Sequence, residues 1–217
     1  MGVIGGIGTL ATALLVIVPP AESAPSGTGS GYFVGVTGAT VSSISADYVV
    51  PRFSCVGQLQ FGMAVKIGAG GELSTGGATL VTCTKSGGTP VLSTVLSFVG
   101  NQIENPVKVK TGDKIAIRDT YGASQSTVTF TNLTTDQSVS ETGPGGTGDC
   151  AFVGVVREAF ALVPTFKVID FTDARENGAP LSRADLTKYD LNLEGTQQVQ
   201  TTVISHGTAF RELFKHN

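Results

Sequence analysis

A serine that could do chemistry lies inside the glycine-rich stretch GAGGELSTGG, residues 68–77. A hydroxyl can act as a nucleophile when a histidine accepts its proton and an acid orients that histidine. The chain has 2 histidines, His206 and His216, both near its C-terminus. His206 directly follows Ser205, and neighbours on a strand point to opposite faces, so these two side chains do not pair. A contact between His206 and Ser74 stays open, although an exposed histidine at a strand end is the plainer interpretation.

Paired carboxylates are a second source of chemistry, because one can act as general base and the other as general acid. Glu72, Asp119 and Glu158 lie in or beside segments with strand character. They serve this purpose only if the fold brings two of them onto facing strands; otherwise they are solvated charges at a rim. No Cys or His spacing is typical of zinc, and residues 68–77 lack the ending of a phosphate-binding loop. We expect neither a metal nor a cofactor.

The elements that must position these residues are short segments rich in Val, Thr and Phe, separated by turn residues. Charged residues make up only 14% of the 217 residues, and helical periodicity is limited to at most one turn at residues 183–190. β-branched residues favour strands, and many strands hide their apolar faces by packing as two antiparallel sheets. The sequence therefore predicts an all-β sandwich. The predicted strands span residues 32–36, 40–50, 58–67, 78–84, 91–99, 114–120, 126–133, 137–142, 150–160, 166–174 and 197–205.

The N-terminus carries an uncharged apolar run, Val3–Val18, followed by an abruptly polar segment. This length suits the apolar region of a signal peptide better than a membrane span, although an uncleaved anchor is the alternative. Small residues favour cleavage before Ala24. We expect a secreted protein that is free of the membrane after cleavage. The expected divisions are a signal peptide at 1–23, a linker at 24–31 and a β-sandwich domain at 32–217.

Charge and cysteines narrow the function classes further. The formal net charge of −3 supplies no basic field for nucleic acid. Export permits disulfides, and Cys55, Cys83 and Cys150 allow at most one, without indicating which two residues pair. Asn132-Leu133-Thr134 forms a glycosylation sequon that has meaning only in a eukaryotic secretory pathway.

The order of several motifs along the chain is similar to that of the eqolisins, a family of secreted glutamic peptidases. The matching segments between Gly31 and Phe210 are GYFVGVTGATVSSISADYVVPRF, FGMA, ELSTGG, VKVKTGDKIAIRDTYGASQSTVTFTNLTTDQSVS, CAFVGVV and PTFKVIDFTDA. The resemblance implies two seven-stranded antiparallel sheets packed as a bent, concanavalin-A-like sandwich. It also implies an acid-active endopeptidase whose concave sheet carries a glutamate that activates water and a glutamine amide that stabilises the oxyanion.

The family residues that carry this chemistry are replaced in this chain. The glutamine of the family's LQTG motif falls on Ser74, and the catalytic glutamate falls on Phe152. A cleft aspartate falls on Ala64 and a cleft tryptophan on Gln60, in a chain with no tryptophan. Serine lacks the reach of a glutamine amide, and phenylalanine accepts no proton. We therefore expect a cleft, formed by these residues and Glu72, that has no catalytic pair.

Three functions are compatible with this interpretation. The first is a secreted, non-catalytic binding or structural module whose concave cleft holds an extended peptide or a glycan. The second is an active acid endopeptidase in which Glu72 or Glu158 replaces the lost glutamate. The third is a carbohydrate-binding sandwich, suggested by architecture alone and disfavoured by the lack of tryptophan.

Overall fold

The computed structural model of the chain describes residues 28–35, 40–69, 72–157 and 161–217. The apolar N-terminal run and the expected cleavage site lie outside these residues. Strand β1 (Gly29–Gly35) begins before the boundary expected at Tyr32. Within the described ranges, no helix is long and apolar enough to cross a membrane.

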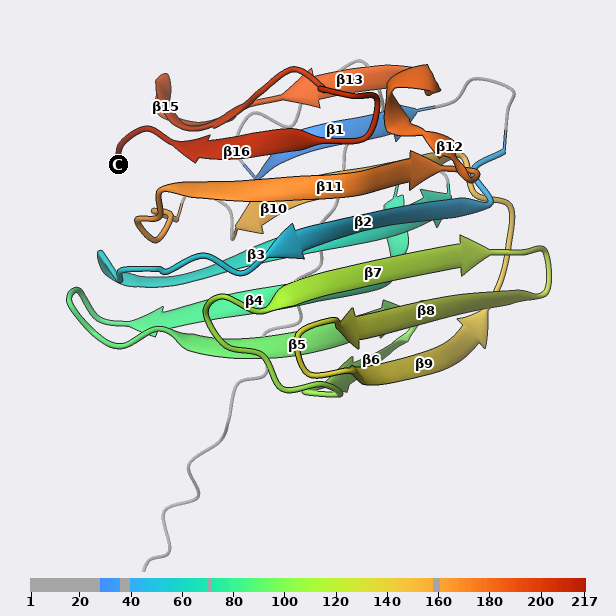
Figure 1. The fold of residues 1–217 in the computed structure, drawn as a ribbon, viewed down its shortest axis with the longest axis horizontal. Helices are drawn as coiled ribbons and strands as arrows, with labels where there is room; N and C mark the ends of the chain where they lie inside the picture. Colours follow the sequence, from blue (N-terminus) through green and yellow to red (C-terminus); the bar gives the residue numbers. More distant parts are fainter. Residues whose placement is uncertain (1–27, 36–39, 70–71, 158–160) are drawn as a thin grey trace, which may run out of the picture.

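Two antiparallel sheets stacked face to face make up nearly all of the described chain, with sheet B in front of sheet A in Figure 1. Sheet A has seven strands in the order β13 (Leu186–Tyr189), β1, β10 (Cys150–Arg157), β3 (Gln58–Ala69), β4 (Glu72–Thr84), β5 (Val91–Phe98) and β6 (Asn101–Glu104). Sheet B has the order β14 (Leu191–Leu193), β15 (Thr196–Thr201), β16 (Phe210–Phe214), β11 (Val168–Glu176), β2 (Ser43–Val49), β7 (Lys114–Tyr121), β8 (Gln125–Asn132) and β9 (Gln137–Pro144), with β12 (Ala179–Pro180) paired to β11. The predicted all-β sandwich of two antiparallel sheets is confirmed.

The strand count of sheet B differs from the expectation of seven, since the described residues give it nine. Among its strands are β12, with 2 residues, and β14, with 3, which are too short to show an alternating pattern in the sequence. The helical turn expected within residues 183–190 is also misplaced. A short 3₁₀ helix spans Leu181–Arg183, and most of the remaining segment forms β13 against β1.

Alternation along each strand separates the core from the outer faces. On β3, Phe61, Met63, Val65 and Ile67 belong to the main core between the sheets. The residues between them face outward, because successive side chains of a strand point to opposite sides. The predicted alternation in β8 is confirmed, since every second residue from Ser126 to Asn132 is buried.

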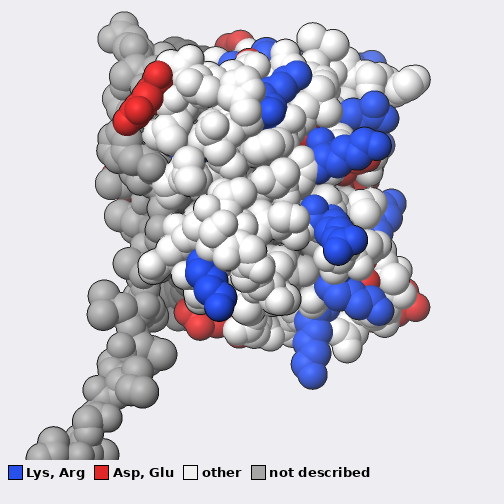
Figure 2. All heavy atoms as spheres, turned by 90° about the vertical axis from the view of Figure 1, so that its left-hand side faces the viewer, with Lys and Arg blue, Asp and Glu red and all other residues white. Residues whose placement is uncertain are grey.

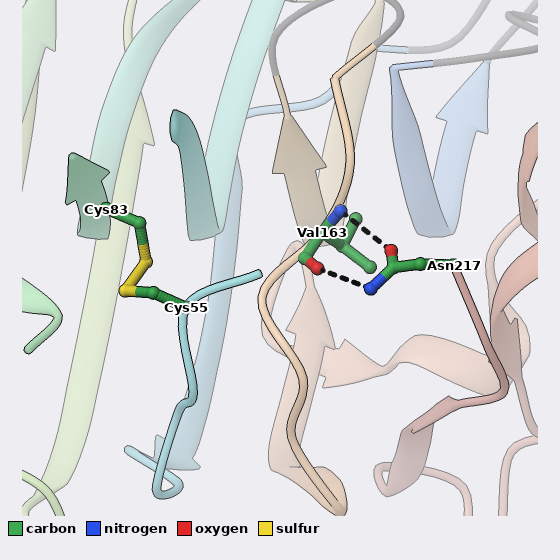
Figure 3. Close-up of a disulfide and its surroundings, with 4 residues drawn as sticks. All are labelled: Cys55, Cys83, Val163 and Asn217. Atoms are coloured by element: carbon green, nitrogen blue, oxygen red, sulfur yellow. Dashed lines mark hydrogen bonds between the residues drawn. A yellow bond between two sulfur atoms is a disulfide. The ribbon is translucent and has the colours of Figure 1, made fainter. Parts of the chain in front are cut away.

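Two ties fix segments that lie outside the strands (Figure 3): one joins a linker to sheet A, and the other joins the C-terminus to the linker between β10 and β11. The disulfide joins Cys55, before β3, to Cys83 near the end of β4, across a sequence separation of 28. This settles the pairing that the sequence left open, and leaves Cys150 as a buried thiol. At the C-terminus, Asn217 Oδ1 accepts a hydrogen bond from Val163 N at 3.2 Å, and its Nδ2 donates to Val163 O at 3.1 Å.

A buried carboxyl group links the two sheets at the β1 side. Ser30 Oγ of sheet A donates to Glu212 Oε2 of sheet B at 2.5 Å, and Thr201 Oγ1 donates to the same oxygen at 3.1 Å. Burial raises the pKa of Glu212 to about 8, although both hydrogen bonds oppose the rise. Glu212 is fully buried, so its protonated form is favoured in acid.

Candidate functional site

One row of paired residues crosses the outer face of sheet A from β1 to β6. Each member lies opposite the next on a neighbouring strand. The row runs Phe33, Phe152, Lys66, Gly76, Ser97 and Gln102. It passes through the middle of the sheet, where the sequence predicts the cleft.

Three of the predicted cleft residues share this outer face. Gln60 and Ala64 lie on β3 at the same strand parity as Lys66. Ala64 is fully buried between Gly154 of β10 and Ala78 of β4. Small residues therefore surround the position where the resemblance implies an aspartate.

Phe152, where the resemblance implies the family's glutamate, is packed into apolar surroundings. It is 5% exposed and belongs to a small cluster with Phe33, Ala64 and Val156. A Cβ added at Gly154 would lie 3.0 Å from Phe152 Cζ, which shows that the ring lies over this glycine. A side chain in this environment supplies neither a proton acceptor nor a hydrogen bond.

Ser74 and Glu72 lie at the start of β4, away from the middle of the row. The register between β3 and β4 shifts beyond Ile67, and Ser74 is the residue left without a partner there. Ser74 Oγ donates to the backbone O of Glu72 at 3.1 Å, and Glu72 is exposed. The two residues thus interact locally. Glu158, the other carboxylate considered from the sequence, lies outside the described residues.

Neither a contact between His206 and Ser74 nor a metal site is found among the described residues. His206 is exposed in a turn after β15, where Ser205 Oγ donates to Ala209 O at 3.3 Å. The hydroxyl of Ser74 is bonded to Glu72 rather than to this histidine. Across the described ranges, no group of three or more His, Cys, Asp or Glu residues could hold a metal ion.

A hollow of about 340 Å³, the outer-face pocket, lies beside this row on β3, β4, β5 and β6. Its floor includes Ala78, Leu80, Val95 and Val156, and its polar lining includes Gln58, Gln60, Lys66, Thr82, Ser93, Ser97, Gln102 and Glu104. Of the two predicted cleft residues on β3, Gln60 lines the pocket and Ala64 does not. Gln102 and Glu104 lie two residues apart on β6, so they share a face. Neither residue could be predicted from the sequence, because a strand of four residues shows no readable alternation.

Lys66 is the least expected member of the pocket. It is only 7% exposed, and it forms no hydrogen bond or ion pair with any residue that the structure describes. A Cβ on Gly76 would lie 2.7 Å from Lys66 Cγ, so the lysine stem runs across the space that this glycine leaves. Burial lowers the pKa of the Lys66 ammonium group, against the attraction of Asp119. A sequence signal exists: one lysine in the otherwise uncharged strand QLQFGMAVKIGA.

Asp119 lies on the other side of the sheet from the pocket, in the core. Its Oδ2 accepts a hydrogen bond from Thr75 Oγ1 at 2.9 Å, whereas its buried Oδ1 has no hydrogen-bond partner among the described residues. Burial raises the pKa of Asp119 to about 7. The residue was a sequence candidate for acid–base chemistry, but it is fully buried and paired with Thr75 rather than with a second carboxylate.

Charge is concentrated on the other sheet. On the outer face of sheet B, Asp47 accepts ion pairs from Lys114 at 3.2 Å and Arg118 at 2.8 Å, and Arg118 also contacts Asp173 at 3.2 Å. Figure 2 shows most of the Lys and Arg side chains of that view gathered along its right-hand edge, beside a broad uncharged surface. Of the residues that line the outer-face pocket, only Lys66 and Glu104 carry charge.

The fold and the pocket together define an all-β sandwich with a hollow on the outer face of its seven-stranded sheet. The model of the peptidase A4 family matches residues 28–211. The chain therefore belongs to the peptidase A4, or eqolisin, family.

Solved structures with this fold include several glutamic peptidases. Scytalido-glutamic peptidase, solved with a transition-state analogue inhibitor, has a TM-score of 0.68 and 16% identity over 88% of this chain and 99% of its own. SCP-B, an eqolisin solved with the tripeptide Ala-Ile-His, has a TM-score of 0.63 and 17% identity over the same shares. Aspergilloglutamic peptidase from Aspergillus niger has a TM-score of 0.53 and 19% identity over 72% of this chain and 99% of its own. A sequence comparison with curated proteins gives no significant match.

Proposed function

We propose that this chain is a secreted, non-catalytic eqolisin that binds extended peptide segments in the outer-face pocket. The observation that carries the proposal is the state of Phe152, which takes the place of the family's glutamate and is buried in an apolar cluster beside Lys66. A general base must be a proton acceptor within reach of the attacking water. Phenylalanine offers none, and Ser74, at the glutamine position, is engaged with Glu72.

The pocket has the features that an extended peptide requires. Gln60 and Lys66 are about 20 Å apart along β3, at 3.3 Å per residue, which is the length of a short extended segment. Apolar floor residues such as Leu80 and Val95 can contact alternate side chains, while Ser93 and Ser97 can bond to backbone groups. Gln60 Oε1 is buried without a hydrogen-bond partner among the described residues, so an acceptor is available for a peptide N–H. SCP-B with its bound tripeptide gives a precedent for peptide binding on this fold.

A glycan is a poorer occupant of the same pocket. None of the residues that line it is aromatic, so it offers no ring on which a sugar could stack. We therefore propose a peptide, rather than a glycan, as the ligand of the pocket.

Secretion is part of the same proposal. The uncharged run Val3–Val18 has the length of a signal-peptide apolar region, and the Cys55–Cys83 disulfide suits an oxidising compartment. Expression of the full chain with its own N-terminus, followed by N-terminal sequencing of the exported protein, tests this. We expect Ala24 as the first residue; retention of Met1 on membranes would contradict it.

A pocket-filling variant tests peptide binding. Ser97→Tyr places a bulky side chain in the row on β5, within the pocket lining, whereas Ser140→Tyr makes the same change at an exposed position on β9, on the other sheet. We expect fluorescent six-residue peptides of alternating alanine and valine to bind the mature protein and the Ser140→Tyr variant alike, and to bind the Ser97→Tyr variant at least tenfold more weakly. Equal binding by all three proteins would refute the assignment of the pocket.

An active acid endopeptidase is the second candidate, because Gln102 and Glu104 place an amide and a carboxylate on one face within the pocket. This pair differs from the earlier candidates, since Glu72 is not among the pocket-lining residues. If it cleaves peptides, Glu104→Gln abolishes cleavage at pH 2–5 and Glu72→Gln does not.

A further inference from the structure

We infer that Lys66 binds a carboxylate group of the peptide that occupies the outer-face pocket. The inference rests on the proposed peptide-binding function and adds the chemical class that the pocket selects. It starts from a buried cationic side chain that the described protein leaves without a counter-ion.

Lys66 lines the outer-face pocket, and its stem runs toward that pocket. Its stem lies over Gly76, the next member of the row toward β5, and the pocket lining includes Lys66 and Ser97 but not Phe152. The ring of Phe152 lies instead over Gly154. Phe152 and Lys66 therefore lean apart, and the lysine stem runs toward the side of the pocket rather than over the apolar cluster.

No carboxylate forms an ion pair with Lys66 among the described residues, and Glu104, which also lines the pocket, lies three strands away on β6. Its neighbours in the row, Phe152, Gly76 and Ser97, are uncharged. Among the described residues, Asp119 in the core attracts the Lys66 ammonium group. Burial raises the pKa of Asp119 to about 7. Asp119 is mostly protonated below that pH, so it does not act as a counter-ion there. A buried charge without a partner is costly, and a ligand that brings one removes the cost.

A carboxylate suits the polar groups that line the pocket better than a phosphate does. The pocket offers one ammonium group together with hydroxyls and amides, whereas phosphate recognition favours a cluster of Arg and Lys. Ser97 and Gln102 continue the row beyond Gly76 and can donate hydrogen bonds to the same group. Glu104 on the same edge repels a second negative charge, so one carboxylate per peptide is favoured.

Three dansyl-labelled probes, whose label carries no carboxylate, distinguish the sources of the carboxylate. Each is a six-residue peptide of alternating alanine and valine that ends in glutamate amide, in glutamine with a free carboxylate, or in glutamine amide. Binding is measured by fluorescence anisotropy at pH 6, where peptide carboxylates are ionised. We expect one or both carboxylate probes to bind the mature protein at least tenfold more tightly than the neutral probe, because charge-assisted hydrogen bonds are the stronger class. The tighter of the two shows whether a side chain or a chain terminus is bound.

Lys66→Met keeps the length of the side chain and removes the charge, and Lys85→Met does the same at an exposed position after β4. We expect the Lys66 variant to bind all three probes equally and the Lys85 variant to behave as wild type. Equal affinity of the wild-type protein for all three probes overturns the inference while leaving peptide binding intact. If none of the probes binds, peptide binding itself fails. The wild-type comparison needs no variant, so poor folding of Lys66→Met would not obscure the result.

Discussion

Phe152 of β10 lies directly opposite Lys66 of β3 in the register of sheet A. A phenylalanine stands where the resemblance implies a catalytic glutamate, and a buried lysine faces it across the strand pair. Lys66 is 7% exposed and Phe152 is 5% exposed, so both belong to the body of the sheet rather than its rim. The middle of the row is thus apolar on one side and cationic on the other.

A side chain at Gly76, where the stem of Lys66 lies, should destabilise the protein. Gly76 has φ of 140°, and a Cβ there would lie 2.3 Å from Val65 O. We expect Gly76→Ala to lower the free energy of unfolding by about 1–3 kcal/mol, as strained backbone positions do. Gly57→Ala is the matched control, since a Cβ at Gly57 has nothing within 4 Å. Urea unfolding measures both, and an equally small effect at the two sites would contradict the packing described for Gly76.

Stability should be higher in acid than in alkali because of Glu212. The pKa of Glu212 is about 8 in the folded state and 4.5 for an ordinary glutamate, so its contribution to the stability is complete below about pH 4 and is lost as the pH rises through 8. We expect the free energy of unfolding to fall by an amount on the order of a few kcal/mol between pH 5 and pH 9, at about 1.4 kcal/mol per pKa unit. Asp119 contributes in the same direction and the lowered pKa of Lys66 in the opposite one.

Glu212→Gln isolates this effect, because the amide resembles the protonated carboxyl and cannot ionise. We expect the variant to lose less stability than wild type over the same pH range, measured as the shift in Tm. Ser30 and Thr201 donate hydrogen bonds to Glu212, so the substitution can also alter these bonds. Glu194→Gln makes the same change at an exposed position and is the matched control. Parallel Tm curves for wild type and Glu212→Gln would show that Glu212 does not carry the pH dependence.

The fold could be predicted from the sequence because strand alternation is a local property. The apolar residues Val128 and Phe130 alternate with threonines, and the structure buries them together with Asn132. The motif order also led to the eqolisin family, which the family match confirms. Short strands such as β6 carried no such pattern, and the pocket residues on that strand were missed with it.

The candidate site depended on the register between strands, which no local pattern contains. Lys66 has the parity of an outward residue, and only its pairing with Gly76 shows that it lies flat and buried. Asn132 illustrates the same limit: its sequon suggests an exposed acceptor, yet it is fully buried and donates to Asp113 Oδ2 at 2.8 Å. The Cys55–Cys83 pairing likewise required the relative positions of the linker and β4.

The disulfide should contribute measurably to stability, because it closes a loop across a sequence separation of 28. Chain-entropy reasoning gives about 3–4 kcal/mol for a loop of this size. We expect the Cys55→Ala/Cys83→Ala protein to unfold at a lower urea concentration by a corresponding amount. Treatment of the wild type with a reductant should give the same shift, and no further shift in the double variant. A midpoint that stays unchanged in both cases would contradict a stabilising role.

Cleavage of a denatured protein substrate by the purified mature chain at pH 2–5 tests the loss of catalysis most directly. The products are followed by mass spectrometry, with a denatured substrate incubated alone as the blank. We predict the same peptide profile with and without the protein, because Phe152 and Ser74 stand where the resemblance implies the groups that activate water and stabilise the oxyanion. New peptides that appear with the wild-type protein and vanish with Glu104→Gln would contradict this and establish an active peptidase.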